Sequence, residues 1–338
     1  MSSAKRLILV TGVPRSGTTA VGQMLALAPG ANTLHEPFNY HSGLQHIAHY
    51  FEIPGTPSFP VQALDRTVAQ LKNLDLKFKS GLFPSDKGWR RVVKYVIGAR
   101  PLNSYRRLRL QANLHTIIWK DPLACFTAEH VARHHEVDVL VTLRNPWAVA
   151  GSFKRMEWAF DLQDLTTRLQ SAGMDFIKAA VPASVNHSVA NGAILWHIIY
   201  SALAAWAATN ARIRFVNLDD IVSAPVITYA KLYQLLGLVW NQRIAGKITT
   251  YYRGESRRSE PKSKKAHDRH RNVGAVNKYW RRYLTEIEKE FVGQVAEETW
   301  LNFQKLCVEN EAGAYCTQEI ASVNKLQSNR FRKHLSNG

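Results

Sequence analysis

The segment Gly12 to Thr19 reads GVPRSGTT, a glycine-framed stretch ending in two hydroxyl residues. It follows the run Lys5 to Thr11, which is apolar after two basic residues and is typical of a strand covered on both faces in a parallel sheet. After it, apolar residues recur at helical spacing until Pro29 and Gly30, where a helix must end. Glycines let the backbone curl so that several N–H groups face one anion, and the helix N-terminus adds partial positive charge. The segment therefore predicts a phosphate-binding loop between a strand and a helix.

This loop lacks one residue of the common triphosphate-binding loop. A Walker A loop has Lys where Thr18 stands, and that Lys reaches the terminal phosphates of ATP or GTP. The cation here is Arg15, inside the loop. A glycine-rich turn that only connects strand and helix is the plain alternative, and we prefer phosphate binding because both flanking elements are of the expected type. The missing Lys argues against a nucleoside triphosphate and favours another ligand with a 5′-phosphate-like end.

Further strands are predicted at Leu114–Trp119, Val137–Leu143 and Ile213–Leu218, with a helix over Thr127–His135. Strands that alternate with helices form right-handed βαβ units, so we expect an α/β fold with a doubly wound parallel sheet flanked by helices. Ligands of such sheets bind at the carboxyl ends of the strands.

The chain has 338 residues, 46% of them apolar, and a formal net charge of +18, so an ordinary globular core is expected and intrinsic disorder is excluded. We predict one α/β domain over residues 1–308, with helical insertions, a helical C-terminal region and a loosely anchored basic tail at 309–338. An insertion at about 39–110 is expected to shape the substrate site. The segment 253–271 carries eight Lys or Arg against three acidic residues and is predicted to be a loop or lid.

Three scattered cysteines favour a reducing, cytoplasmic setting, and no leader or membrane anchor is expected before the first strand.

One long stretch is free of charge: no Asp, Glu, Lys or Arg occurs between Lys178 and Arg212. The apolar part, Ala193 to Ala208, is 16 residues long and would span roughly 24 Å, less than the roughly 30 Å of membrane hydrocarbon. We therefore predict a buried core helix rather than a membrane-spanning one.

The loop and its surroundings resemble a known family. The segment VTGVPRSGTT, followed 17 residues after Thr19 by Glu36 in LHEPFN, is similar to the 5′-phosphosulfate loop and catalytic region of sulfotransferases that use 3′-phosphoadenosine 5′-phosphosulfate (PAPS). The bacterial, carbohydrate and tyrosylprotein branches are more similar than the cytosolic arylsulfotransferases, whose loop usually carries Lys and whose base is His. The resemblance covers roughly the first 40 residues and the stretch 114–225. It implies a P-loop-type fold, PAPS as donor, adenosine 3′,5′-bisphosphate as product, and no metal.

A second motif, Leu143 to Ser152, resembles the 3′-phosphate motif of that family, with Arg144 and Ser152 eight residues apart. Arg144 ends a predicted strand, Asn145 caps the next helix with Pro146 at its first position, and Ser152 lies two turns further on. An exposed Arg beside an ordinary helix start is the alternative. Arg suits phosphate because its planar guanidinium bonds two oxygens at once.

The segment with Arg271, Gly274 and Trp280 is a looser match to the part of the family that closes over the 3′-phosphate and adenine. On this resemblance the nucleotide contacts are Pro14, Arg15, Ser16, Gly17, Thr18, Thr19, Arg144, Ser152 and Arg271.

The resemblance also names the catalytic residues. Glu36 occupies the family's Glu position and is our general base, Arg15 lies inside the loop, and Lys120 in WKDP matches a position that stabilises the transferring group. A solvated Lys120 with Asp121 as its local partner is the alternative. His35 is the rival base, because imidazole titrates nearest neutral pH. Neighbours in an extended segment point to opposite faces, so His35 and Glu36 are not expected to act together.

Two other functions fit parts of the sequence. A P-loop kinase or related phosphotransferase needs the missing Lys and a Mg²⁺ carboxylate, and no predicted strand ends in a clear Asp of that kind. Nucleic-acid binding would suit the charge of +18, but basic charge attracts any polyanion, and no nucleic-acid-binding module is recognisable.

The sulfuryl acceptor is expected to be a carbohydrate or glycolipid hydroxyl, ahead of peptide Tyr or a small metabolite, and peripheral membrane contact stays open. Trp89, Tyr95 and Tyr105 are either a sugar platform or packing groups.

Overall fold

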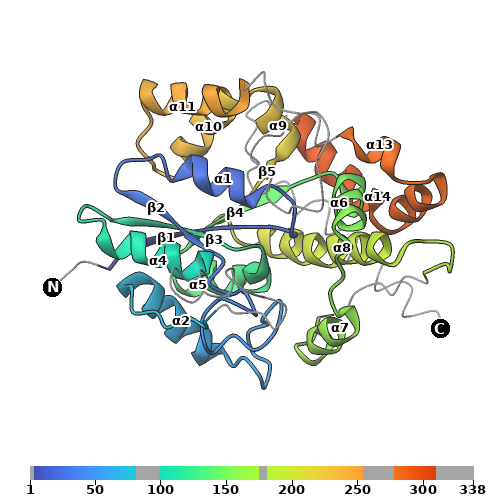
Figure 1. Cartoon of the computed structure of the whole chain (residues 1–338), viewed down its shortest axis with the longest axis horizontal. Coiled ribbons are helices and arrows are strands. Elements are labelled where there is room, and N and C mark those ends of the chain that lie inside the picture. Colours follow the sequence, from blue (N-terminus) through green and yellow to red (C-terminus); the bar gives the residue numbers. More distant parts are fainter. Residues whose placement is uncertain (1–3, 81–98, 175–180, 254–277, 310–338) are drawn as a thin grey trace, which may run out of the picture.

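The computed structural model describes residues 4–80, 99–174, 181–253 and 278–309. A parallel sheet of five strands in the order β2-β3-β1-β4-β5 forms its centre (Figure 1). The strands are β1 Arg6–Thr11, β2 Ala31–His35, β3 Thr116–Lys120, β4 Asp138–Leu143 and β5 Ile213–Asn217. The expected α/β class and the four predicted strands are confirmed. The fifth strand, β2, was not predicted. It is a half-buried edge strand, and its sequence ANTLH therefore lacks the continuous apolar run of the buried strands.

The strand order places a topological switch at the centre of the sheet. The chain leaves β1 for β2 and β3 on one side, and β4 then pairs with the other side of β1, from Ile8 opposite Asp138 to Thr11 opposite Val141. In open α/β sheets, ligands bind where the order reverses, outside the carboxyl ends of the strands. The loop after β1 and the turn after β4 both emerge at this point.

Helices cover both faces of the sheet (Figure 1). One layer packs on Ile8 and Val10 and consists of α1 Thr18–Leu25, α9 Leu218–Ser223, α10 Pro225–Leu235 and α11 Gln242–Arg253. The other layer packs on Leu7 and Leu9, the alternate residues of β1. It includes α2 Val61–Asn73, α4 Arg100–Leu110, α5 Ala128–His134, α6 Pro146–Met156, α7 Leu162–Ser171, α8 His187–Ala207 and α14 Glu286–Glu309, with a 3₁₀ turn, η1, at Pro122–Thr127. The short α13, Trp280–Tyr283, packs on α6. Both faces of the central strand are buried, as its continuous apolar run predicts.

The uncharged stretch forms α8, as the prediction of a core helix requires. By length and composition His187–Ala207 is the one helix among the described residues that resembles a membrane span, with a mean hydropathy of 1.3. Two of its large side chains, Trp196 and Tyr200, are 0% exposed and donate hydrogen bonds to the carbonyls of Arg144 and Thr142. The helix packs between α6 and α14. Core packing therefore accounts for its apolar composition.

The chain between β2 and β3 contributes α2 and α4. Tyr105 is buried in the core, and its hydroxyl donates to the Leu74 carbonyl at 2.7 Å, so Tyr105 is a packing group and not part of a sugar platform. Trp89 and Tyr95 lie outside the described residues, as do Arg271, Gly274 and all but the first residue of the basic loop. Only Glu309 of the predicted tail is described, at the end of α14. The domain boundaries stay a prediction.

Gly12 has a local role that can be tested. Its φ is +137°, and a Cβ there would lie 2.6 Å from the Thr142 carbonyl oxygen. Gly55 also has a positive φ, +90°, but a Cβ there meets nothing within 4 Å. We expect Gly12→Ala to lower the free energy of unfolding by about 3 kcal/mol and Gly55→Ala by about 1 kcal/mol, measured by urea denaturation. Equal losses in the two variants would contradict the close approach of the loop to β4.

Candidate active site

The predicted phosphate loop lies between β1 and α1, at the switch point of the sheet. The Ser16 amide donates to the Val13 carbonyl at 3.0 Å, and the Ser16 hydroxyl bonds the Thr142 hydroxyl of β4 at 2.7 Å. Gly17 has φ +98° and is the N-cap residue of α1, and in the described part of the chain no side chain caps the helix there. The first turn of α1 carries no acidic residue. This helix start is therefore electropositive and suited to an anion.

Arg15 extends from this loop toward α6. It has φ +80°, an unfavourable backbone conformation for a residue with a Cβ, which persists only where the surroundings hold it. Its guanidinium lies 5.6 Å from the centre of the Trp158 ring, and its Nε donates to the Ser152 hydroxyl at 3.0 Å. The loop is thus joined directly to the second predicted anion-binding segment.

That second segment has the local structure its sequence predicts. β4 ends at Leu143, the Asn145 side chain caps α6 by accepting from the Ala148 amide at 3.2 Å, and Pro146 is the first helical residue. Arg144 is 4% exposed and donates to the Arg15 carbonyl at 2.8 Å. Arg144 and Ser152 therefore approach the loop from the strand end and from the helix, through two separate hydrogen bonds.

Arg155 and Tyr279 also lie beside this segment and were missed by the sequence analysis. Arg155 is three residues after Ser152, so the two share a face of α6, and it is 8% exposed. The Tyr279 hydroxyl donates to the Gly151 carbonyl at 2.6 Å. Burial raises the pKa of Tyr279 to about 12, against a lowering effect of the positive charges of Arg155 and Arg144. Helical spacing from Ser152 is the signal that would have identified Arg155.

The start of α13 packs against α6. Trp280 stacks with Trp147, their ring centres 5.8 Å apart, and its Cβ lies beside Gly151. Of the loosely matched C-terminal segment, Trp280 is thus placed next to the Ser152 helix, whereas Arg271 and Gly274 lie outside the described residues.

Glu36, Lys120 and His35 meet at the ends of β2 and β3. His35 pairs with Lys120 across the two strands, and the Glu36 amide donates to the Lys120 carbonyl at 2.8 Å. Lys120 is 2% exposed, and its ammonium bonds Glu36 Oε1. The alternative of a solvated Lys120 paired with Asp121 is therefore wrong: a buried ammonium requires a partner, and the turn after β2 supplies Glu36.

The expectation that His35 and Glu36 point to opposite faces is also wrong. Glu36 has φ +47°, so the chain leaves the extended conformation at this residue and the alternation of strand side chains stops. His35 Nε2 consequently lies 3.8 Å from Glu36 Oε1. His35, Glu36 and Lys120 therefore form one cluster, the Glu36 corner.

Asp121 connects the two segments that form the Glu36 corner. It is 0% exposed, and its carboxylate accepts the amides of Phe38 at 2.7 Å and Leu123 at 3.0 Å. It thereby connects the turn that carries Glu36 to the end of β3. Burial, followed by the nearby negative charge of Glu36, raises the pKa of Asp121 to about 7.

The raised pKa of Asp121 predicts a pH dependence of stability. Between its ordinary value of 3.8 and about 7, the folded protein holds the proton more than the unfolded chain does. The unfolding free energy should therefore fall with rising pH, by at most about 1.4 kcal/mol per pH unit. Relative to Asp121→Asn, the wild type should lose about 2 kcal/mol between pH 5 and pH 7 in urea titrations. If the difference in unfolding free energy between the wild type and Asp121→Asn instead stays constant from pH 5 to pH 7, the backbone amides and Lys120 keep Asp121 ionised in the folded protein.

The Glu36 corner and the Arg144 segment flank the predicted phosphate loop. Lys120 pairs with Val10 of β1, two residues before Gly12, and the Asp121 amide donates to the Val10 carbonyl at 2.9 Å. On the other side of β1, β4 leads into Arg144. The order across the sheet is therefore Glu36 with Lys120, then the loop with Arg15, then Arg144 with Ser152.

A polar hollow of about 300 Å³ adjoins the Glu36 corner. It extends from Lys120 and His35 to α4, and its walls are mostly polar or basic. It is lined by Thr19, Gln23, Ala26, Asn32, Thr33, His35, Arg100, Ser104, Arg107 and Lys120. Its volume is at the lower end of the range for small-molecule sites.

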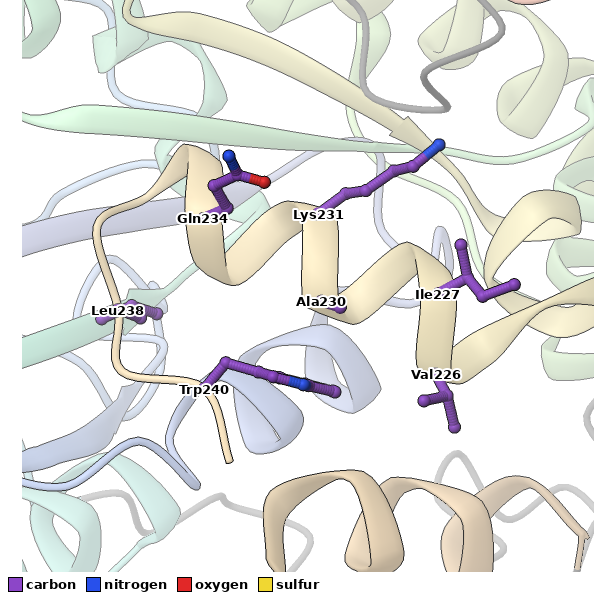
Figure 2. Close-up of a pocket in the computed structure, with 7 residues that line it drawn as sticks. All are labelled: Val226, Ile227, Ala230, Lys231, Gln234, Leu238 and Trp240. Atoms are coloured by element: carbon purple, nitrogen blue, oxygen red, sulfur yellow. The ribbon is translucent and has the colours of Figure 1, made fainter. Parts of the chain in front are cut away.

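Another hollow follows α10 and is lined by Val226, Ile227, Ala230, Lys231, Gln234, Leu238 and Trp240 (Figure 2). Lys231 is its one charged lining residue. None of these residues belongs to the loop, the Glu36 corner or the Arg144 segment. This hollow is therefore separate from the candidate active site.

Comparison with known proteins identifies the family. A model of the sulfotransferase family matches residues 8–242, which include the loop, the Glu36 corner and the Arg144 segment. The chain belongs to the sulfotransferase family. No curated protein matches it.

Two solved structures similar to the chain are sulfotransferases from mycobacteria. STF1 from Mycobacterium tuberculosis has 17% sequence identity and a TM-score of 0.36, covering 73% of this chain and 72% of its own. STF9 from Mycobacterium avium has 13% identity and a TM-score of 0.36, covering 84% of this chain and 77% of its own. The family assignment rests on the sequence model.

Proposed function

We propose that this sulfotransferase moves the sulfuryl group of PAPS to a hydroxyl of a carbohydrate or glycolipid, with Glu36 as general base. The observation that carries the proposal is the contact between the two anion-binding segments, with Arg15 Nε 3.0 Å from Ser152 Oγ and Arg144 2.8 Å from the Arg15 carbonyl. A nucleotide with phosphates at both its 3′ and 5′ positions suits two adjoining anion sites. A nucleoside triphosphate would instead need the Lys that Thr18 replaces.

In this proposal each corner has a separate task. The residues of the loop, Pro14 to Thr19, hold the 5′ end, and Arg144 and Ser152 hold the 3′-phosphate, with Arg155 adding charge. PAPS supplies an activated sulfuryl group whose S–O bond to the 5′-phosphate breaks as the bond to the acceptor oxygen forms. Glu36 takes the acceptor's proton, and Arg15 and Lys120 face the developing negative charge of the leaving phosphate and the sulfuryl oxygens. Positioning and electrostatics of this kind account for most catalysis in the related transfer of phosphoryl groups.

The acceptor proposal is supported by the polar hollow next to the Glu36 corner. The Gln23 side chain offers hydrogen bonds to a polyhydroxyl ligand, and few apolar groups line the hollow. The Ser104 hydroxyl, by contrast, already donates to the Pro101 carbonyl and accepts the His35 amide. Arg100 and Arg107 at its α4 side favour an acceptor that also carries negative charge. We further propose a cytoplasmic setting, in keeping with a free, buried Cys125.

Ligand-induced stabilisation tests the donor. Adenosine 3′,5′-bisphosphate is expected to raise the melting temperature, whereas ATP with Mg²⁺ and a single-stranded oligonucleotide at equal concentration have a smaller effect, because only a ligand that binds the folded state stabilises it. A larger shift with ATP and Mg²⁺ would favour phosphoryl transfer, and one with the oligonucleotide would favour nucleic-acid binding. Transfer of labelled sulfate from PAPS to a panel of neutral and acidic oligosaccharides then tests the acceptor class.

A further inference from the structure

A second cluster of titratable side chains lies away from the candidate active site. Asp65 on α2 faces His130 on α5 and His135, the residue that follows α5. Both imidazole Nε2 atoms lie 2.7 Å from the same oxygen, Asp65 Oδ1. All three candidate ligand atoms lie within 4.8 Å of one another. Figure 1 shows α2 and α5 as neighbours beneath the sheet.

We propose that Asp65, His130 and His135 form a Zn²⁺ site that connects α2 to α5. Two imidazole nitrogens and one carboxylate oxygen are a ligand set that zinc takes in proteins, with water at the fourth tetrahedral position. Hard cations such as Mg²⁺ and Ca²⁺ prefer oxygen ligands throughout, so two imidazoles argue against them. The site is therefore expected to bind a borderline transition-metal ion.

The geometry needs only a small adjustment to admit the ion. With metal–ligand bonds near 2.0 to 2.1 Å, tetrahedral ligand atoms lie roughly 3.3 Å apart. The two N–O distances of 2.7 Å would each open by roughly 0.6 Å, within the reach of side-chain rotation. Each Nε2 must present its lone pair to zinc, so a proton on Nε2 moves to Nδ1 or leaves to solvent.

The ligands are held in place but still reachable. The side chains of His130 and His135 are 14% and 20% exposed, whereas Asp65 is 42% exposed and opens the cluster to solvent. The Lys72 ammonium donates to the His135 carbonyl at 3.1 Å and fixes the residue after α5 from the α2 side.

The cluster lies at the amino end of the strands. His135 comes three residues before Asp138, where β4 begins, whereas the phosphate loop and Arg144 follow the carboxyl ends of β1 and β4. An ion at Asp65 would therefore strengthen the attachment of α2 to the core and take no part in the transfer reaction. Its presence or absence is independent of the proposed sulfuryl transfer.

Zinc titration of the full chain, stripped of metal with a chelator, tests the site. Isothermal calorimetry with ZnCl₂ should give one saturable site, and zinc at 100 times its dissociation constant should raise the melting temperature by roughly 4 °C. Asp65→Asn and His135→Gln should each weaken zinc binding at least about tenfold. His187→Gln, which removes an exposed imidazole at the start of α8, is the matched control and should bind zinc as the wild type does.

A wild-type measurement keeps the test independent of how the variants fold. Co²⁺ in place of Zn²⁺ should give the intense visible absorption of a four-coordinate ion bound by nitrogen and oxygen. Absence of a saturable site in the wild type, or unchanged binding in both Asp65→Asn and His135→Gln, would overturn the proposal. Equal loss in His187→Gln would overturn it as well, because the binding would then belong to surface histidines in general.

Discussion

Glu36→Gln is expected to lower kcat by about 10²- to 10⁴-fold, the usual contribution of a general base. The amide cannot take the acceptor's proton, but its oxygen still accepts a hydrogen bond from the buried Lys120 ammonium, so the corner keeps its shape. Affinity for adenosine 3′,5′-bisphosphate should change little, because the proposed nucleotide sites are the loop and the Arg144 segment. Steady-state sulfuryl transfer and calorimetric nucleotide binding measure the two quantities.

His35→Gln is the matched control for this result. Its Nε2 lies 3.8 Å from the same Glu36 oxygen, so the substitution removes the rival base from the same cluster and leaves Glu36 and Lys120 in place. It should retain most of the turnover. If His35→Gln were inactive while Glu36→Gln kept its activity, the imidazole would be the base and our assignment would be wrong.

Arg144→Ala should weaken binding of adenosine 3′,5′-bisphosphate by about 10- to 100-fold. A hydrogen bond to a charged group contributes about 1.5 to 3 kcal/mol, and about 1.4 kcal/mol corresponds to a factor of ten. Arg144→Lys keeps the charge but not the planar fork, and should restore only part of the affinity. Calorimetry on the wild type and both variants provides the comparison.

Binding of 5′-AMP separates a direct role of Arg144 from an indirect one. Arg144 also donates to the Arg15 carbonyl at 2.8 Å, so its removal disturbs the loop to some degree. If Arg144 binds the 3′-phosphate, the bisphosphate should lose far more affinity than 5′-AMP, which lacks that group. Equal losses for the two ligands would mean that Arg144 only supports the loop.

The sequence predicted the parts of the molecule that depend on local patterns. The apolar run of β1, the glycines of the loop, and the Asn145-Pro146 start of α6 each determine the structure of a few consecutive residues, and all three are confirmed. The approach of Arg144 and Ser152 to the loop followed from parallel topology, because strand ends of one sheet meet at one edge.

Other features depend on contacts between distant residues. Lys120 and Glu36 are 84 residues apart, and their pairing requires β2 to lie beside β3, although β2 was not predicted. The positive φ of Glu36, which brings its side chain toward His35, is an exception that no residue pattern indicates. Likewise, Asp121 follows a strand in sequence as a solvated Asp would, yet the turn after β2 covers it completely.

The most direct test of the account is a crystal structure with adenosine 3′,5′-bisphosphate bound. We predict the 5′-phosphate in the loop from Gly12 to Thr19 and the 3′-phosphate within hydrogen-bonding distance of Arg144 and Ser152. A nucleotide bound with only one phosphate in these two segments, or bound elsewhere on the protein, would contradict the claim that they hold the two ends of one ligand.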